Sequence, residues 1–270
     1  MKYSLSAKNL TCRNLEAYAD YRASLVTPDC TKEITGIVRS DSGLPSIGLN
    51  QVISNMVMPP RIIQRFALDY FAERHSPFTL WHSATKPLDN DALDELGLKR
   101  RQSLVAMAAE IPRLSVAEVP VVERLTISAV KKEALPDYGA VQAAAAGELE
   151  GAQLTHFYQG LQEIPEQRRG RLKLFLASLD GVPVAAGCLF AAADALGLYD
   201  LVTLPDYRGR GIGRALFKHL LTAAQGSHHK NLVALVPADR QQLLLDSGFF
   251  AVGEVARYQY TPAPAAPKPD

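Results

Sequence analysis

The sequence predicts a mixed α/β fold built from two similar halves. Short apolar runs typical of strands alternate with helical patterns along the chain, as expected for a mixed sheet covered by helices. One order of strand, short helix, glycine and strand also occurs twice. The composition agrees with a globular protein, because 47% of the 270 residues are hydrophobic and 21% are charged. This length suffices for one large domain or two smaller ones.

The charge balance argues against several kinds of partner. The chain has 29 Lys and Arg against 28 Asp and Glu, a formal net charge of +1. Nucleic-acid binders and membrane-surface proteins use a basic surface that this composition does not provide, so we expect neither partner. No apolar run approaches the ~20 residues of a membrane span, and the N-terminus lacks the apolar core of a signal peptide. We therefore expect a cytoplasmic protein.

The cysteines and histidines indicate no metal site. Cys12, Cys30 and Cys188 are an odd number and form no CxxC pair, which indicates reduced thiols rather than a disulfide framework. The six histidines show no spacing typical of metal ligands. The sequence predicts that no metal is bound.

A break in the pattern separates the two halves. Pro112 and Pro120 bracket it, and we place a domain boundary around residue 119. Downstream, the patterns predict a strand at 124–130, two helices divided near Gly147 and Gly151, a hairpin at Asp180-Gly181, a strand at 197–204, a helix ending near 225, a strand at NLVALV, a short helix at 240–246 and a closing strand at 253–260. The prolines of the last residues favour a disordered tail over 262–270.

The first half repeats the end of this order. The segments PFTLWH, DNDALDELGL and RRQSLVAMAAEI read as strand, short helix and strand, as do NLVALV, DRQQLLLDSGFF and the closing strand. Matching Gly97 to Gly248 gives an offset of 248 − 97 = 151 residues. A repeat of that size indicates a duplicated domain rather than a solenoid. The expected domains are residues 1–118, residues 119–261 and the tail at 262–270.

One segment, LVTLPDYRGRGIGRAL, has the pattern of an anion-binding turn. An apolar strand runs into Gly209, Gly211 and Gly213, and an amphipathic helix begins at once. Glycines allow successive backbone N–H groups to converge, and the helix N-terminus adds partial positive charge, so the turn is suited to a pyrophosphate. The segment contains no GxxxxGK[ST] motif. It does not match GxGxxG either, because Arg214 stands where the third glycine would fall.

What the segment does match is RxxGxG, formed by Arg208, Gly211 and Gly213. In this respect the sequence resembles the GNAT superfamily of N-acetyltransferases, whose acyl-CoA pyrophosphate lies on the loop after the fourth strand. The Asp180-Gly181 hairpin and the Ser247-Gly248-Phe249 segment extend the resemblance over roughly residues 124–260. The resemblance implies two GNAT-like domains in tandem, of which the C-terminal one keeps an intact acyl-CoA loop.

The resemblance also implies site residues and a reaction. The backbones of Leu201, Val202 and Thr203 would contact the acyl group and pantetheine of acetyl-CoA. The backbone N–H groups from Arg208 to Arg214 would hold the pyrophosphate, a range that includes Gly209, Arg210, Gly211, Ile212 and Gly213. The strands of this family splay apart here, which leaves N–H groups to stabilise an oxyanion. The implied reaction is direct attack of an amine on the thioester, without a covalent acyl-enzyme.

Two positions depart from the family pattern. Leu244 stands where many members have the tyrosine that protonates the CoA thiolate, and Pro237 replaces a frequent asparagine. Tyr207 and Tyr258 remain as other sources of a proton. Asp200 is the carboxylate inside the apolar strand, and we take it as the candidate for binding the substrate or acting as base, with water as the alternative.

The N-terminal half lacks the glycine turn. Its corresponding segment, MVMPPRIIQRFALDYF, has two prolines and no glycine, so we expect a degenerate half that has lost CoA binding. The sequence thus predicts an acetyl-CoA-dependent N-acetyltransferase. The acceptor is a small-molecule amine or a protein amino group, and both remain open. The alternatives are a non-catalytic acyl-CoA-binding sensor, suggested by Leu244 and Pro237, and a purely structural interaction domain.

Overall fold

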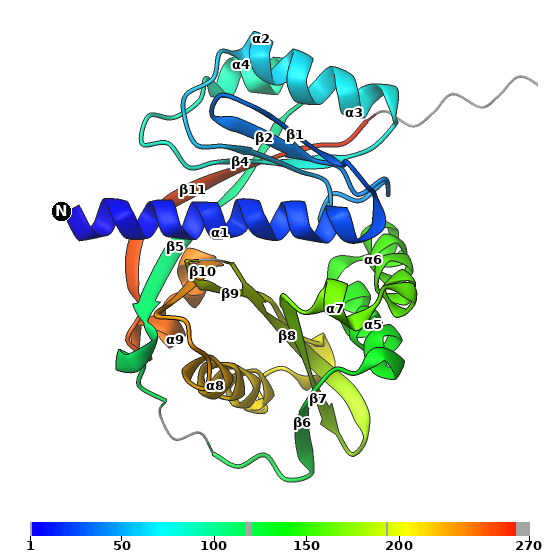
Figure 1. Cartoon of the computed structure of the whole chain (residues 1–270), viewed down its shortest axis with the longest axis vertical. Coiled ribbons are helices and arrows are strands. Elements are labelled where there is room, and N and C mark those ends of the chain that lie inside the picture. Colours follow the sequence, from blue (N-terminus) through cyan, green and yellow to red (C-terminus); the bar gives the residue numbers. More distant parts are fainter. Residues whose placement is uncertain (1, 117–119, 193, 263–270) are drawn as a thin grey trace, which may run out of the picture. The chain divides into compact units, whose positions relative to one another are not determined.

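The computed structural model describes residues 2–116, 120–192 and 194–262, with the backbone alone for residues 2–6. Its described residues divide into two compact units (Figure 1). Unit 1 comprises Met1–Tyr18 and Val105–Gly253, and unit 2 comprises Ala19–Leu104 and Glu254–Asp270. The predicted Pro-rich tail lies, except for residue 262, outside the described residues. The boundary expected near residue 119 divides the two halves of the sequence rather than these two units, and it stays a prediction.

Three elements contribute residues to both units. They are the helix α1 (Lys2–Val26) and the strands β5 (Lys99–Glu110) and β11 (Phe250–Tyr260). The sequence patterns predict both strands, but they do not predict α1. Its apolar residues form no strong stripe along one face, because charged and polar side chains interrupt the helical period.

Unit 1 is a mixed sheet in the strand order β5-β10-β9-β8-β7-β6. The strands not yet given are β6 (Leu125–Ala129), β7 (Leu172–Leu179), β8 (Val182–Ala191), β9 (Leu196–Thr203) and β10 (Asn231–Val236). β9 and β10 pair in parallel, whereas the other neighbours are antiparallel. The hairpin between β7 and β8 turns at Asp180 (φ 52°) and Gly181 (φ 81°), which confirms the predicted turn with two positive φ angles.

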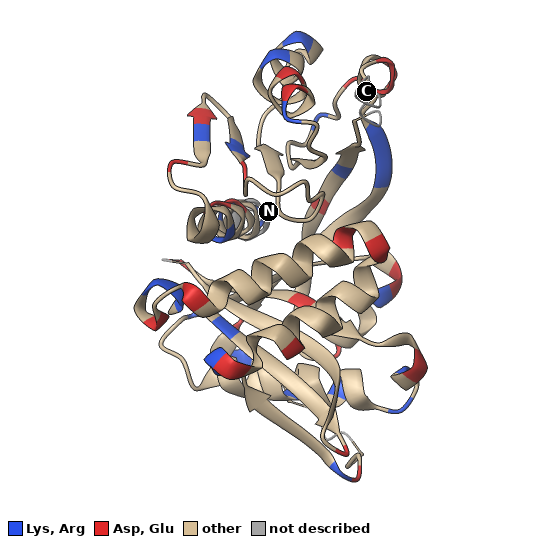
Figure 2. Ribbon diagram, turned by 90° about the vertical axis from the view of Figure 1, so that its right-hand side faces the viewer, with Lys and Arg blue, Asp and Glu red and all other residues tan. Residues whose placement is uncertain are grey.

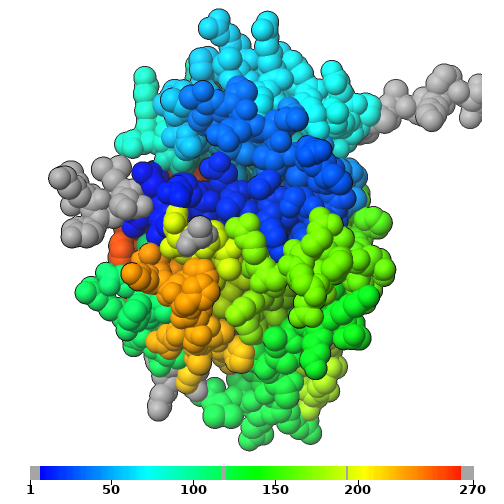
Figure 3. Space-filling view, in the orientation of Figure 1, coloured from blue at the N-terminus to red at the C-terminus, as the bar shows by residue number. Residues whose placement is uncertain are grey.

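Helices cover both faces of this sheet. The helix α8 (Ile212–Gln225) packs on β8 and β9 from one side, while α5 (Leu135–Ala146) packs on the same strands from the other, joined by α6 (Glu148–Gly160) (Figure 1). Parts of these helices lie on the surface of the unit in the view of Figure 3. The shorter helices of the unit are η2 (Ile111–Arg113), η3 (Lys132–Ala134), η4 (Leu161–Glu163), α7 (Glu166–Arg169), η5 (Pro205–Tyr207), η6 (Ala238–Arg240) and α9 (Gln242–Leu245).

The stripe predicted on α8 is the centre of the core of unit 1. Leu216 and Leu220 are fully buried in one apolar cluster with residues of β7, β8, β9 and β10. Gly187 on β8 permits this close packing, because a Cβ there would lie 2.9 Å from Cδ1 of Leu220. The core therefore fixes the position of α8 on the sheet, and with it the position of the turn that precedes α8.

Unit 2 repeats the arrangement with the strand order β1-β2-β3-β4-β11. Its strands are β1 (Thr31–Ile34), β2 (Ile37–Ser40), β3 (Gln51–Ser54) and β4 (Phe78–His82), and β3 and β4 are again the parallel pair. Between them run α2 (Pro60–Ile63), the π-helical turn η1 (Gln64–Leu68) and α3 (Asp69–Glu73); α4 (Asn90–Glu95) follows β4. Two halves of like topology confirm the predicted fold class.

The repeat extends to single hydrogen bonds. Leu98 N donates to Leu93 O at 2.9 Å, and Phe249 N donates to Leu244 O at 3.1 Å, so the same turn recurs at an offset of 151 residues. Each unit also takes its last strand from the other half of the sequence, because β5 pairs with β10 and β11 pairs with β4. The duplicated halves thus exchange their closing strands.

Acidic and basic residues are interspersed along the elements of both units in the view of Figure 2. This distribution agrees with the net charge of +1. None of the described helices is long and apolar enough to cross a bilayer. The cytoplasmic location stays a prediction.

Candidate functional site

The glycine turn joins the end of β9 to the start of α8. Leu204 N donates to Val184 O at 2.9 Å, which holds the strand end, and the short helix η5 follows. Gly209 (φ 76°) and Gly211 (φ 81°) then adopt left-handed conformations that disfavour side chains. Gly211 is the N-cap residue of α8 and makes no side-chain cap.

Gly213, the third glycine, has no room for a side chain, because Thr203 lies beside it. A Cβ at Gly213 would lie 3.0 Å from Oγ1 of Thr203, so a side chain there would push the start of the helix away from the end of β9. Glycine at this position keeps the first turn of α8 beside the strand.

The electrostatics of the turn favour an anion. The first turn of α8 contains no acidic residue, and the helix of 14 residues places partial positive charge at its N-terminus. Arg208, Arg210 and Arg214 are exposed around it. Arg208 also donates from Nε to Thr203 O at 3.1 Å, so this side chain supports the end of β9. The arrangement is chemically able to hold a phosphate or pyrophosphate.

β9 and β10 separate just before this turn. Their parallel pairing runs from Leu196–Leu232 to Leu198–Ala234, although β9 continues to Thr203 and β10 to Val236. The backbone of Tyr199–Thr203 is therefore not paired to β10 on that side in the described structure. Strand N–H groups at such a gap are available to a ligand carbonyl.

A bulge in β9 coincides with the gap. On β8, Ala186 faces Val202 and Cys188 faces Tyr199, so two β9 residues stand opposite Gly187. One of them, Asp200, has a φ of 54°, a left-handed conformation that Asp tolerates better than most residues. The bulge turns the Asp200 side chain out of the regular alternation of the strand.

Three helices contact the bulge through polar side chains. Oδ2 of Asp200 accepts hydrogen bonds from the Tyr18 hydroxyl of α1 at 2.6 Å and from the Tyr158 hydroxyl of α6 at 3.2 Å. Gln142 of α5 donates from Nε2 to the backbone carbonyl of Asp200 at 2.7 Å. The strained residue is therefore held at both its side chain and its backbone.

The preceding residue, Tyr199, is fixed from α1 as well. Its ring stacks on that of Tyr18, with the centroids 4.1 Å apart, and its hydroxyl donates to Oδ1 of Asn14 at 2.8 Å. Desolvation raises the pKa of Tyr199 well above its usual range, and the nearby Cys188, Cys12 and Asp200 act in the same direction. Tyr199 is therefore a neutral hydrogen-bond donor at physiological pH.

The structure places the two departures from the family pattern in structural roles. Leu244 is 3% exposed and belongs to the core cluster of unit 1, and Pro237 precedes the short helix η6. Tyr258 lies in unit 2, where its buried hydroxyl donates to Oδ1 of Asn90 at 2.7 Å. Tyr207, in the turn itself, packs against the core. The centroid of its ring lies 5.2 Å from Cζ of Arg210.

Sequence reasoning missed Asn14, Tyr18, Gln142 and Tyr158. A weak signal exists, because Asn14 and Tyr18 are four residues apart and so share one face of a helix. The bond from Tyr18 to Asp200 joins residues 182 positions apart in sequence, which no local pattern encodes. Among the described residues, no group of three or more His, Cys, Asp or Glu side chains could hold a metal ion.

Comparison with known proteins finds similarity to one family in sequence and to several solved structures in fold. Residues 139–244 match the sequence model of the Acetyltransferase (GNAT) family. No curated protein matches the chain. A conserved protein of unknown function from Staphylococcus epidermidis is similar in structure, with a TM-score of 0.67 at 13% identity over 88% of this chain and 96% of that one.

Two named structures share the fold. A GCN5-related N-acetyltransferase from Kribbella flavida has a TM-score of 0.61 at 16% identity, covering 94% of this chain and 96% of that chain. A tandem GNAT protein from the clavulanic acid biosynthesis pathway has a TM-score of 0.51 at 15% identity, covering 92% and 89%. Residues 139–244 therefore match the GNAT acetyltransferase family in sequence, and the chain shares its fold with GNAT proteins that include a tandem one.

Proposed function

We propose that the protein is an acetyl-CoA-dependent N-acetyltransferase that acetylates a primary amine in unit 1. The observation that supports it most is the turn with left-handed Gly209 and Gly211 at the start of α8, inside the segment that matches the GNAT family. Such a turn is suited to the pyrophosphate of CoA, whose charge the helix N-terminus and the three arginines would offset.

In this proposal the donor extends from the turn along β9. Backbone N–H groups from Arg208 to Arg214 hold the pyrophosphate, and the backbones of Leu201, Val202 and Thr203 contact pantetheine and the acetyl group. The separation of β9 from β10 leaves room for this contact on the strand. The open strand N–H groups would stabilise the oxyanion that forms on the thioester carbonyl.

The reaction requires only a neutral amine and a proton path. The amine nitrogen attacks the carbonyl carbon, the new C–N bond forms, and the C–S bond breaks with the electron pair leaving on sulfur. The amine loses a proton to Asp200 or to water, and the CoA thiolate takes one from solvent. Because a thiol has a pKa near ~8.5, the thiolate can leave without the tyrosine that Leu244 replaces.

Unit 2 contributes no second donor site in this proposal. The segment after β3 enters its helix through Pro59 and Pro60 and contains no glycine, so it does not present converging N–H groups as the turn of unit 1 does. Proline lacks a backbone donor altogether. We propose that this half is a degenerate GNAT-like domain.

Donor binding is tested by a thermal-shift titration with acetyl-CoA. A ligand at about 100 Kd adds about 2.7 kcal/mol of apparent stability, so a clear rise in Tm is expected. Gly211→Asp should abolish the rise, because it strains a left-handed residue and adds negative charge to the anion site. Gly181→Asp is the matched control, since Gly181 is also left-handed (φ 81°) and has no neighbour within 4 Å. An equal rise in the Gly211→Asp protein would contradict the site.

A second candidate is a non-catalytic acyl-CoA sensor. It is favoured by the burial of Leu244 in the core, which leaves no proton donor at that position. Release of CoA thiol from acetyl-CoA in the presence of primary amines distinguishes the two functions. Binding without release by any amine would favour the sensor.

A further inference from the structure

One face of the unit 2 sheet carries two arginines beside the only tryptophan of the chain. Arg257 of β11 is the register partner of Trp81 of β4, so their side chains share a face, and Cζ of Arg257 lies 5.8 Å from the centroid of the Trp81 ring. Gln259, two residues along β11, lies on the same face, and its Oε1 accepts from Nε of Arg101 of β5 at 2.8 Å. We call these four residues the arginine patch. Arg101 is exposed and the other three side chains are half-buried, so a solute can reach the patch.

The indole ring of Trp81 is held in place from β3. Its Nε1 donates to Oε1 of Gln51, a side chain that is 8% exposed. Gln51 in turn donates from Nε2 to the backbone carbonyl of Gly48 at 2.8 Å. The indole N–H group is therefore already used within unit 2, and Trp81 contributes its ring alone to the arginine patch.

No carboxylate offsets the charge of the two guanidinium groups. Within the described part of the chain, neither Arg101 nor Arg257 forms an ion pair, and the buried Nε of Arg257 donates to no acceptor. Burial lowers the pKa of Arg257, and the nearby charge of Arg101 acts in the same direction, so the two cations repel each other. An unpaired buried donor and two like charges both cost free energy, which an anion would offset.

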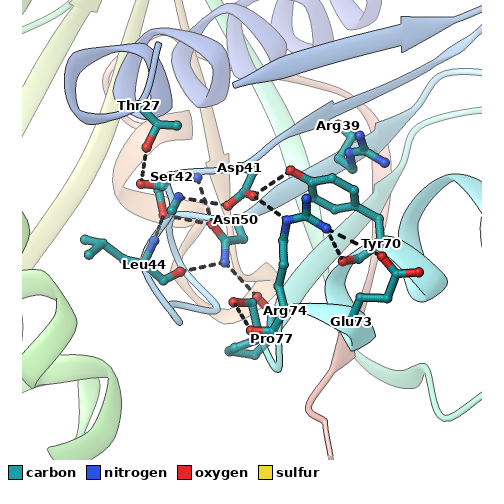
Figure 4. Close-up of polar contacts among 12 residues, drawn as sticks. Thr27, Arg39, Asp41, Ser42, Leu44, Asn50, Tyr70, Glu73, Arg74 and Pro77 are labelled. Carbon is teal, nitrogen blue, oxygen red and sulfur yellow. Dashed lines mark hydrogen bonds and ion pairs between the residues drawn. The ribbon is translucent and has the colours of Figure 1, made fainter. Parts of the chain in front are cut away.

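A second pair of arginines in unit 2 shows such an arrangement together with its anion (Figure 4). The guanidinium groups of Arg39 and Arg74 lie 3.4 Å and 3.7 Å from the centroid of the Tyr70 ring. Oδ2 of Asp41 accepts from the Tyr70 hydroxyl at 2.8 Å and lies 3.9 Å from Nε of Arg74. The arginine patch has the aromatic ring and the two guanidinium groups of this cluster, but the described residues supply no carboxylate to it.

We propose that the arginine patch binds a small dianion, a phosphate monoester or a dicarboxylate, whose oxygens accept hydrogen bonds from Arg257 and Arg101. A guanidinium group holds such oxygens through two parallel N–H donors. In Arg257 the unpartnered Nε forms one such pair with an Nη group, and in Arg101 the Nη groups form another, because Gln259 uses its Nε. Two cations without an acid favour two negative charges over one.

The proposed site lies within unit 2 and is independent of the proposed function. All four residues of the arginine patch belong to unit 2, as does Gln51. The half of the chain that lacks the glycine turn would therefore bind a ligand of its own, recognised by side chains rather than by a backbone turn.

Binding is measured by nuclear magnetic resonance on the full-length protein without acetyl-CoA. Because Trp81 is the only tryptophan, labelling tryptophan with ¹⁵N gives one indole N–H signal that needs no assignment. Labelling arginine with ¹⁵N at Nε adds the signal of Arg257, which is assigned from its loss in Arg257→Gln or, if that variant does not fold, in Arg257→Lys. The probes are inorganic phosphate and succinate, at a pH where both are dianions, with acetate as the monoanion and KCl to keep the ionic strength constant.

We expect at least one of the two dianions to move both signals saturably. Saturation by phosphate alone indicates a phosphate monoester as the ligand, whereas saturation by succinate alone indicates a dicarboxylate. Acetate should bind about tenfold more weakly or not at all, because it leaves one guanidinium group without a charged acceptor.

Variants of the two arginines test their roles in the site. Arg257→Gln and Arg101→Gln should each weaken dianion binding by about tenfold or more, since hydrogen bonds between charged groups are strong. Arg101 is exposed, so its variant tests the site even if Arg257→Gln does not fold. Arg100→Gln is the matched control, because it removes the same charge from the next residue of β5, whose side chain alternates to the other face. Its binding should stay within about twofold.

Three results would overturn the inference. The first is that neither dianion moves the Trp81 and Arg257 signals saturably, and the second is that acetate or KCl moves them equally. The third is dianion binding that both arginine variants leave unchanged. None of these results depends on unit 1, so the thermal-shift titration with acetyl-CoA can succeed while this inference fails, and the reverse also holds.

Discussion

At the scale of single residues, Asp200 combines a strained backbone with a charged side chain. A φ of 54° in a strand is rare for residues other than glycine, and here it is held by hydrogen bonds from Tyr18, Tyr158 and Gln142. Because side chains from three helices maintain this strained conformation, the bulge is a candidate for a functional role. Both the conformation and the charge can be tested separately.

The conformation of Asp200 predicts an order of stability among its variants. Asp200→Asn and Asp200→Val both remove the carboxylate, but Asn tolerates the left-handed region and a β-branched residue does not. We expect Asp200→Val to lower the free energy of unfolding by about 1–2 kcal/mol more than Asp200→Asn does. Urea denaturation followed by circular dichroism measures the difference. Equal stability of the two variants would show that the bulge is not maintained in solution.

Tyr199 predicts a loss of stability at alkaline pH. Its pKa is raised in the folded protein, while the unfolded chain releases the proton near about pH 10, the ordinary value for tyrosine. The folded state then holds more protons than the unfolded state, so stability is complete below about pH 10 and falls as pH rises above it. Tyr199→Phe should reduce the fall of Tm between about pH 8 and pH 11. If Tm falls equally in the Tyr199→Phe variant and in the parent protein, Tyr199 is not the cause of the fall.

At the scale of elements, α8 links the core to the candidate site. Its buried stripe packs on the sheet, and its first turn directly follows the glycine turn. The helix was predictable because apolar residues recur with its period over the whole length. Its position on the sheet followed from packing, in which Gly187 allows Leu220 to approach β8.

The packing of α8 predicts a large effect of truncating its buried face. Leu220 is 0% exposed, so Leu220→Ala should lower the free energy of unfolding by about 2–5 kcal/mol. Thr222→Ala, on the exposed face of the same helix, should change it by less than about 0.5 kcal/mol. Chemical denaturation of both variants provides the comparison. A cost below about 1 kcal/mol for Leu220→Ala would mean that the helix does not anchor the turn.

At the scale of the whole molecule, the two halves of the sequence are interdependent because they exchange closing strands. β10 of unit 1 pairs with residues 105–110, which precede the expected boundary near residue 119. An edge strand that loses its partner exposes a row of backbone donors and acceptors. Cutting the sequence at its apparent boundary would therefore leave the edge of β10 that faces β5 unpaired.

This exchange predicts how fragments behave. A fragment of residues 119–270 should unfold without a cooperative transition or aggregate, whereas a fragment of residues 99–270 keeps β5 and should be the more stable of the two. Thermal unfolding followed by circular dichroism, with size-exclusion chromatography, measures both. A shorter fragment that melts as cooperatively as the longer one would show that β5 is dispensable for unit 1.

The sequence by itself determined the elements whose signals are local. The Asp180-Gly181 turn follows from the positive φ angles that these residues tolerate, α8 from its period, and the glycine turn from backbone freedom at Gly209 and Gly211. The similarity of the two halves could be recognised in the sequence because the same short turn occurs once in each half, at a fixed offset. These features depend on neighbours within a few residues.

Only the tertiary structure decided which side chains meet at the bulge and which strands close each unit. The bond from Tyr18 to Asp200 and the pairing of β5 with β10 join residues more than 100 positions apart. Such contacts depend on how whole elements pack, and a polar side chain on a helix carries no local mark of its distant partner. The glycine turn could thus be predicted from the local sequence, whereas the cluster of polar side chains around Asp200 forms only once the helices have packed on β9.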